Sequence, residues 1–235
     1  MKVFWTESAA VPAPKGFAIH LDGRPLRTPS KAALLVPTEL LANAIAAEWQ
    51  AQSDNVNPIT MPLTRAANTV IDRISLHRDA VVAEIAQYGE TDLLCYRAPN
   101  PDRLIALQAQ AWDPLLDWAA VELDANLQVT SGLMHCLQPQ DSLDALRNAV
   151  AHHTVWQLSG LHDLVTLSGS LIIGLAVSKR HLSAEAAWPI SRIDEAWNIE
   201  EWGEDAEAAA LADRKRTDFL NAERLLSLLG PSSGA

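Results

Sequence analysis

The chain has 235 residues, of which 49% are hydrophobic and 20% are charged, so we expect a folded protein with a substantial core. Its 29 acidic and 18 basic residues give a formal net charge of -11. This balance argues against a nucleic-acid-binding protein, because such proteins need a basic face to neutralise phosphates. The negative charge favours solubility, or a partner that carries a complementary basic patch.

The two cysteines, Cys95 and Cys136, are not spaced as a C-x-x-C motif, and two thiols are too few to crosslink a chain of this length. We expect both to be reduced and buried. The first ten residues, MKVFWTESAA, lack the apolar segment of a signal peptide and the arginine-rich pattern of a transit peptide. These features predict a cytoplasmic protein.

The N-terminal stretch is predicted to form β structure. Gly16–Leu21 and Arg24–Thr28 alternate in character on either side of Asp22-Gly23, a dipeptide typical of tight hairpin turns. Five prolines between positions 12 and 37 disfavour a long helix in this region. We therefore expect a small β-rich N-terminal domain over residues 1–60.

Beyond Pro37 the apolar residues recur with the helical period of about 3.6 residues. Residues that favour helix N-termini precede the periodic segments, and glycines follow several of them. Helices are expected over residues 38–49, 62–74, 77–88, 100–123, 141–159, 183–202 and 205–229. Strands followed by helices predict an α+β fold, with a larger all-helical C-terminal domain over 61–230 and a disordered tail over 231–235.

Leu164–Val177 contains no charged residue and is apolar on every side, which predicts a buried helix at the centre of the helical domain. Asp163 and Lys179 flank it, and it is shorter than the roughly 20 residues that span a bilayer. Its segment Gly169–Gly174 has the glycine spacing of a phosphate-binding loop. Leu175 stands where that loop requires lysine, so we expect no nucleotide site.

The histidines do not form a convincing catalytic or metal-binding pattern. His152 and His153 would diverge by about 100° on a helix and could not chelate a metal as a pair, and His162 lies nine residues beyond. His135 and Cys136 are adjacent, so on a strand they would point to opposite faces. The sequence therefore predicts no catalytic residue, no metal site and no cofactor.

Acidic residues and tryptophans alternate in the C-terminal third of the chain. This composition is typical of protein-binding surfaces, although a solvated helix face is the simpler structural explanation. A functional alternative is a small-molecule hydrolase or transferase that uses the carboxylates of Glu200–Glu207, or the imidazoles of His152 and His162. That alternative requires a concave pocket with convergent polar groups.

Two arginines of the first helical region also need an explanation. Arg65 and Arg73 lie among small and apolar residues, where a guanidinium group needs a carboxylate partner. An ion pair that bridges the domains is the structural interpretation, and contact with a peptide or an anion is the functional one.

Several segments together resemble one family, the F1-ATPase assembly chaperones that bind the free α subunit. The segments occur in the family's order and cover most of the chain: LDGRPLRTP (Leu21–Pro29), AIAAEWQAQ (Ala44–Gln52), MPLTRAANTVIDR (Met61–Arg73), DLLCYRA (Asp92–Ala98), LSGSLIIGLAV (Leu167–Val177) and WNIEEWGEDAEA (Trp197–Ala208). The chain departs mildly from the family in the last segment, where Asn198 stands in place of a frequent glutamine.

The resemblance implies a bacterial member without enzymatic activity, cofactor, nucleic-acid partner, membrane insertion or small-molecule substrate; eukaryotic members would be mitochondrial. Such a protein holds the α subunit and shields its β-facing surface until the α/β ring forms. The family's sensitive acidic position falls at Asp194 or Glu195, and its sensitive tryptophan at Trp49. We expect partner contacts from Asp194, Glu195, Trp197, Glu201, Trp202 and Glu204, and folding-sensitive positions at Trp49, Arg65 and Arg73.

Overall fold

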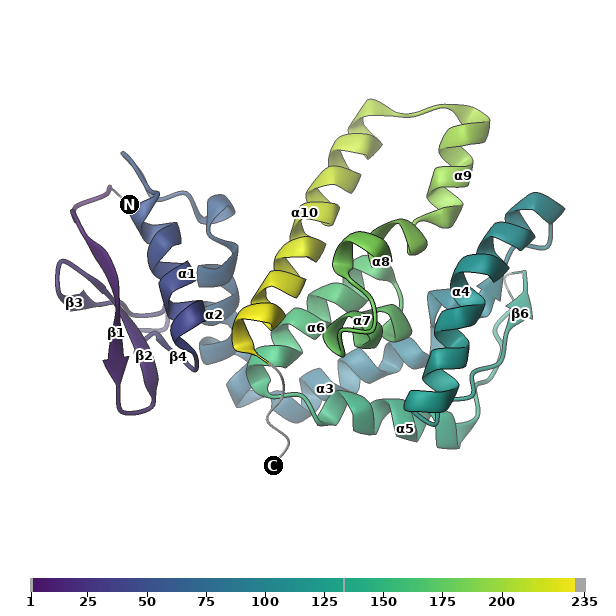
Figure 1. Cartoon of the computed structure of the whole chain (residues 1–235), viewed down its shortest axis with the longest axis horizontal. Coiled ribbons are helices and arrows are strands. Elements are labelled where there is room, and N and C mark those ends of the chain that lie inside the picture. Colours follow the sequence, from purple (N-terminus) through teal and green to yellow (C-terminus); the bar gives the residue numbers. More distant parts are fainter. Residues whose placement is uncertain (1, 133, 231–235) are drawn as a thin grey trace. The chain divides into compact units, whose positions relative to one another are not determined.

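The structure is a computed structural model that describes residues 2–132 and 134–230 (Figure 1). The described residues form two compact units. The first contains residues 2–78, 154–160 and 224–230, and the second contains residues 79–132, 134–153 and 161–223. Residues 61–78 are thus grouped with the N-terminal strands, while a domain boundary after residue 60 stays a prediction. The predicted tail over 231–235 lies outside the described residues.

A small antiparallel sheet occupies the N-terminal part of the first unit. Its strands are β1 (Ser8–Ala13), β2 (Gly16–Leu21), β3 (Arg24–Pro25) and β4 (Leu35–Val36), and β2 pairs with the other three. Asp22 and Gly23 have positive φ values of 47° and 77°, as a tight hairpin turn requires. The Asp22 carboxylate also accepts hydrogen bonds from the backbone N–H groups of Thr6 and Glu7. The predicted hairpin is therefore confirmed.

Two helices lie wholly within this unit, α1 (Glu39–Gln50) and α2 (Pro62–Asp72). The side chain of Thr38 accepts a hydrogen bond from the N–H of Leu41 and caps α1, as predicted. Ile19 of β2, Ile45 of α1 and Leu63 of α2 are buried in one apolar cluster. The unit is therefore held together by the burial of one face of the sheet against the helices.

The second unit is mostly helical. Its helices, three of which (α3, α6 and α10) also have residues in the first unit, are α3 (Arg78–Gln87), α4 (Asp102–Glu122), α5 (Gln140–Ala151), α6 (Val155–Ser168), α7 (Leu171–Ser178), α8 (Ala184–Ile190), α9 (Ile193–Trp202) and α10 (Ala206–Leu229). A short parallel ladder, β5 (Tyr96–Arg97) with β6 (Thr130–Ser131), adds to them. Strands followed by helices confirm the α+β class. No helix in the described part of the chain is long and apolar enough to cross a membrane.

The predicted single helix over Leu164–Val177 is wrong, because the chain breaks between α6 and α7. Gly169 has a φ of 73°, which ends α6, and Ser170 caps α7 by accepting a hydrogen bond from the N–H of Ile173. The expected burial is confirmed for Leu171–Val177. A Cβ on Gly174 would lie 2.4 Å from Val165 Cγ2, so the two helices pack too closely for any larger residue there.

Two further predicted helices are also divided. The helix expected over 141–159 ends at Ala151, and Thr154 and Gln157 then cap the start of α6 reciprocally. The helix expected over 183–202 is broken into α8 and α9. At this break the hydroxyl and the backbone N–H of Ser191 both donate to the carbonyl of Trp188, in the last turn of α8.

Candidate functional site

The acidic, tryptophan-containing stretch that was predicted to bind a partner lies mainly on α9 in the second unit. The structure places its members in two groups. The half-buried group is Asp194, Glu195 and Trp197, and the exposed group is Glu201, Trp202 and Glu204. Trp202 exposes 85% of its surface, which is unusual for so large an apolar side chain.

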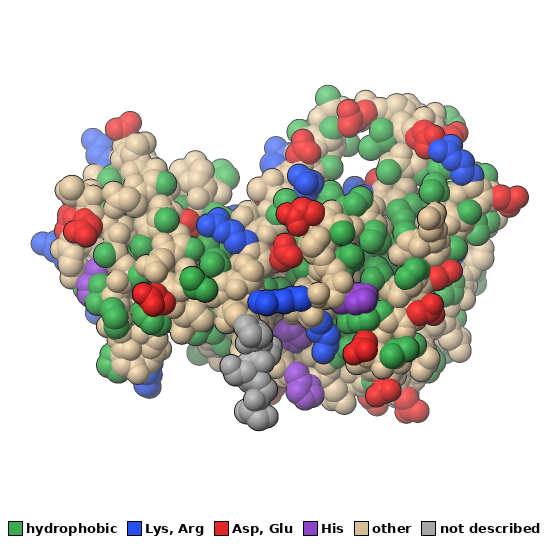
Figure 2. Space-filling model, in the orientation of Figure 1, with side chains coloured by type: hydrophobic (Ala, Val, Ile, Leu, Met, Phe, Trp, Pro, Cys, Tyr) green, Lys and Arg blue, Asp and Glu red, His purple; other side chains and the backbone are tan. Residues whose placement is uncertain are grey.

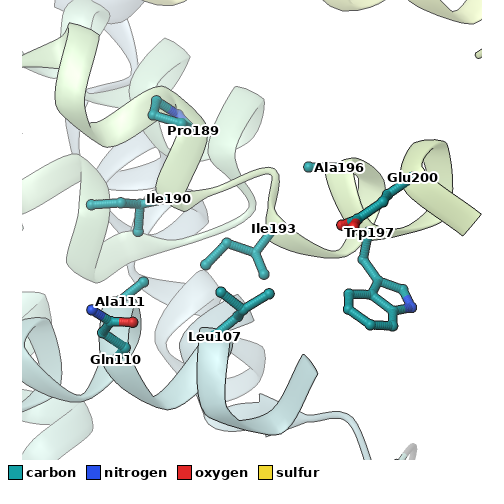
Figure 3. Close-up of a pocket in the computed structure, with 9 residues that line it drawn as sticks. All are labelled: Leu107, Gln110, Ala111, Pro189, Ile190, Ile193, Ala196, Trp197 and Glu200. Atoms are coloured by element: carbon teal, nitrogen blue, oxygen red, sulfur yellow. The ribbon is translucent and has the colours of Figure 1, made fainter. Parts of the chain in front are cut away.

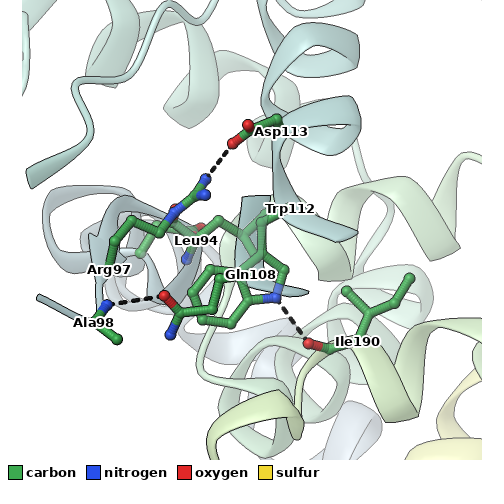
Figure 4. Close-up of polar contacts among 8 residues, drawn as sticks. Leu94, Arg97, Ala98, Gln108, Trp112, Asp113 and Ile190 are labelled. Atoms are coloured by element: carbon green, nitrogen blue, oxygen red, sulfur yellow. Dashed lines mark hydrogen bonds and ion pairs between the residues drawn. The ribbon is translucent and has the colours of Figure 1, made fainter. Parts of the chain in front are cut away.

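Asp194 connects α9 to α4 through a buried amide. The Nε2 group of Gln108 donates to Asp194 Oδ1 at 2.6 Å. At the other end of the amide, Gln108 Oε1 accepts from the N–H of Ala98 at 2.8 Å, a bond that Figure 4 shows. Gln108 is only 1% exposed, so both ends of its amide are satisfied inside the protein. Asp194 also lies in the first turn of α9, where negative charge is favourable. This carboxylate therefore helps to position α9.

A second set of contacts fixes α4 against α8. The indole Nε1 of the fully buried Trp112 donates to the carbonyl of Ile190 at 2.9 Å (Figure 4). The guanidinium of Arg97 lies 5.2 Å from the ring centroid of Trp112 and donates to the carbonyl of Leu94 and to Asp113. The pattern of the sequence had not singled out Arg97, nor Gln108 and Trp112, whose partners Asp194 and Ile190 lie 86 and 78 positions away in the chain.

An apolar groove lies between α4 and the α8–α9 segment (Figure 3). Its volume is about 350 Å³. The walls are built by small and apolar side chains together with one amide and one carboxylate: Leu107, Gln110, Ala111, Pro189, Ile190, Ile193, Ala196, Trp197 and Glu200. Trp197 is thus the one predicted contact residue that lines this groove.

Arg103, one turn before Leu107 on α4, contacts two of the residues that line the groove. Its Nη2 donates to both carboxylate oxygens of Glu200, at 2.8 and 3.1 Å, and its guanidinium lies 5.1 Å from the ring centroid of Trp197. Both ion-pair partners are more than half exposed, so the pair adds little to stability. It does fix where the indole and the carboxylate lie.

Glu195 is held within its own region. Its carboxylate forms an ion pair with Arg192 at 2.6 Å, and the Arg192 guanidinium lies 5.6 Å from the ring centroid of Trp188. The charge of Glu195 is therefore already partly compensated, whereas Asp194 faces a neutral amide. Which of these two residues matches the family's sensitive acidic position stays open. The surroundings of the two carboxylates differ clearly.

The remaining carboxylates of this region give it a strongly negative surface. Residues 193–213 contain eight acidic side chains and no lysine or arginine. Figure 2 shows acidic side chains over α9 and the start of α10. Within the described residues, Glu201, Glu204 and Glu207 are exposed and have no basic partner in an ion pair. This face can therefore attract a cationic partner.

Trp49, the tryptophan that was expected to be sensitive, is distant from α9 in the sequence and belongs to the first unit. Trp49 packs against the apolar cluster, with its ring 5.3 Å from that of Trp5. The neighbouring Glu48 is buried, and its carboxylate accepts hydrogen bonds from the N–H of Leu63 and from the N–H and hydroxyl of Thr64. Because these groups start α2, Glu48 caps that helix from α1.

Arg65 and Arg73 are exposed on and just after α2. The carboxylate of Asp72 accepts hydrogen bonds from the Thr28 hydroxyl at 2.7 Å and from the N–H of Ser30 at 3.1 Å. The bond from Thr28 lowers the pKa of Asp72. Asp72 therefore links the end of α2 to the loop after β3. A folding role for the two arginines stays a prediction.

A buried carboxylate in the second unit was missed. Asp92 is 0% exposed and accepts hydrogen bonds from the N–H of Leu94, the hydroxyl of Ser170 and the N–H of Ile172. Burial raises the pKa of Asp92 to about 6, and the hydrogen bonds oppose this shift. Asp92 belongs to the segment DLLCYRA, and Ser170 belongs to LSGSLIIGLAV. Two of the resembling segments therefore meet at the start of α7.

The histidine side chains form hydrogen bonds with neighbouring side chains. His153 Nε2 lies 2.8 Å from the Ser178 hydroxyl, and burial lowers the pKa of this histidine. A hydrogen bond with Asp163 raises the pKa of His162. Among the described residues, no three His, Cys, Asp or Glu side chains lie close enough together to hold a metal ion.

Both cysteines are free, and Cys95 is buried whereas Cys136 is half-buried.

Comparison with known proteins gives a consistent result. The profile of a family described as ATP12 chaperone protein matches residues 2–120. The chain is 25% identical over 236 residues to a Schizosaccharomyces pombe protein named atp12, mitochondrial, covering 95% of this chain and 81% of that protein. The crystal structure of Atp12 from Paracoccus denitrificans is 46% identical, with a TM-score of 0.94 and coverage of 97% of this chain and 98% of that one. A solved aspartate-to-lysine mutant of the Paracoccus protein also gives 46% identity and a TM-score of 0.94, covering 97% of each chain.

Proposed function

Because the chain belongs to the ATP12 chaperone family, whose members assist the assembly of F1-ATPase, we propose that it binds the unassembled α subunit. The bound chaperone covers the surface of α that later faces the β subunit, and it leaves when the α/β ring forms. The mechanism is mass action: a protein that binds only the folded, unassembled subunit lowers the concentration of free subunit available for aggregation. We place this activity in the bacterial cytoplasm.

The α9 region supports this proposal. Its half-buried residues, Asp194, Glu195 and Trp197, are fixed by contacts with Gln108, Arg192 and Arg103. Its exposed residues, Glu201, Trp202 and Glu204, combine charge with a large apolar surface. A rigid base with exposed tryptophan and acidic side chains is the arrangement expected of a protein-binding surface.

The enzymatic alternative has weaker support. A hydrolase or transferase needs several polar groups that converge on a pocket. Glu200 is the one carboxylate among the described residues that line the groove, and it is bound by Arg103. Glu201, Glu204 and Glu207 are exposed to solvent. We therefore favour a binding function.

We expect the purified chain to co-elute with the isolated α subunit of F1-ATPase in size-exclusion chromatography. We also expect it to reduce the light scattering of α diluted from denaturant, because the covered apolar surface is no longer free to aggregate. An unrelated acidic protein of similar size and charge is the control. Separate elution of the two proteins, with unchanged scattering of α, would contradict the proposal.

A further inference from the structure

We propose that the groove between α4 and α8–α9 receives one apolar side chain from a basic segment of the partner polypeptide. This inference rests on the proposed function, because it describes how the same region would recognise the α subunit. It goes further in naming the recess that anchors the partner and the chemistry of the segment that enters it.

The two walls of the groove are helix faces with matching spacing. On α4 they are formed by Leu107, Gln110 and Ala111, and on α9 by Ile193, Ala196 and Trp197. These positions recur three or four residues apart, so each set lies along one side of its helix. In Figure 3 the side chains of Leu107 and Ile193 lie close to one another between the helices. The floor is therefore apolar and continuous.

Four side chains outside the lining, those of Gln108, Asp194, Trp112 and Arg103, fix the elements that form the groove. The bonds from Gln108 to Asp194 and from Trp112 to the carbonyl of Ile190 fix the distance between α4 and the α8–α9 segment. Arg103 holds the side chains of Trp197 and Glu200. A preformed recess of this kind binds without the cost of ordering its own walls.

The composition of the lining favours a side chain over a small metabolite. The volume of about 350 Å³ lies at the lower end of the roughly 300–1,000 Å³ of ligand pockets. A metabolite site also needs several placed polar groups, whereas this lining offers the amide of Gln110 and the already paired Glu200. An apolar anchor that enters a pocket is the usual centre of a protein interface.

The negative charge near the groove favours a basic partner segment as the source of the apolar side chain that enters it. Glu201 and Glu204 lie one and four positions after the wall residue Glu200, and neither forms an ion pair with any residue that the structure describes. Residues 193–213 contain no lysine or arginine. An apolar side chain next to lysine or arginine would fill the groove and pair with these acids. An acidic segment would be repelled.

The test places a large side chain in the groove, first from one wall and then from the other. Ala196→Phe on α9 and Gln110→Trp on α4 both start from exposed positions that line the groove, so the fold should persist. Ala210→Phe, on an exposed position of α10 outside the lining, is the matched control. Each variant is titrated against isolated F1 α subunit by fluorescence anisotropy, and its thermal unfolding is recorded.

We expect both filling variants to bind the α subunit about tenfold or more weakly than the wild type, and the control to bind normally. If both filling variants fold and bind like the wild type, the groove inference is wrong and the proposed function stands. If the wild-type protein does not bind α, the proposed function itself is wrong, and this outcome is distinct from a failure of the groove inference alone.

A photo-crosslinking residue at Gln110 identifies the occupant in the wild-type background. We expect it to capture an α-subunit peptide with a large apolar residue within about four positions of lysine or arginine, the distance of one helical turn. Capture of an acidic α peptide, or of a second copy of this chain, would overturn the inference. Retention of a bound lipid or metabolite in the groove of the purified protein would do the same.

Discussion

Replacement of Asp92 by asparagine is expected to lower the free energy of unfolding by about 1–3 kcal/mol at neutral pH. The carboxylate accepts three hydrogen bonds, from the N–H groups of Leu94 and Ile172 and from the hydroxyl of Ser170. An asparagine has one acceptor oxygen, so its NH2 group would face one of these donors. The site is fully buried, and water cannot replace the lost bond.

The same substitution is expected to change how stability depends on pH. Burial raises the pKa of Asp92 to about 6 from its ordinary value of 3.8, so the native state binds the proton more tightly than the unfolded chain. This contribution to stability is fully present below about pH 4 and is lost as the pH rises through about 6. It amounts to at most about 3 kcal/mol.

Urea unfolding of the wild type and of Asp92→Asn, followed by circular dichroism between pH 4 and 7.5, measures both effects. The stability difference between the two proteins should widen as the pH falls, because asparagine does not titrate. Asp117→Asn, on an exposed position of α4, is the control and should follow the wild type. A difference that is constant across this range would show that the pKa of Asp92 is not raised.

Charge reversal at Glu201 and Glu204 is expected to weaken binding to the isolated α subunit about tenfold or more at low salt. Both carboxylates are exposed and lie outside the contacts that hold α9 in place, so the fold should be unaffected. The loss should shrink as the salt concentration rises, because the Debye length falls from about 10 Å at 0.1 M to about 3 Å at 1 M.

The double variant Glu201→Lys/Glu204→Lys is compared with Asp117→Lys/Glu122→Lys, which changes the net charge equally at exposed positions of α4. Affinity and association rate for α are measured by surface plasmon resonance at several salt concentrations. An equal loss in both double variants would mean that net charge, and not the α9 face, attracts the partner. Wild-type affinity in the first variant would remove these two acids from the interface.

Local signals in the sequence determine much of the fold. The Asp22-Gly23 turn, the cap at Thr38 and the start of α10 after Asp205 follow from residues that are adjacent or a few positions apart. The Gly169-Ser170 pair was wrongly included in the single helix predicted over Leu164–Val177. It is a helix stop followed by a helix cap, and both residue types are typical of those positions.

The candidate site was only partly predictable, because its parts come from distant segments. The stretch on α9 could be identified from its composition, but the contacts from Gln108 to Asp194 and from Arg103 to Glu200 join residues 86 and 97 positions apart. A single sequence gives no register for such pairs. For the same reason the buried role of Asp92, whose partner Ser170 is 78 positions away, could not be foreseen.

Sedimentation velocity of the chain with the isolated α subunit, before and after addition of the β subunit, tests the central claim most directly. We expect a one-to-one complex with free α, because a single surface is covered. We expect β to displace the chaperone, because both proteins compete for that surface of α. A chain that binds no α, or that stays on α within an assembled α/β ring, would contradict this account.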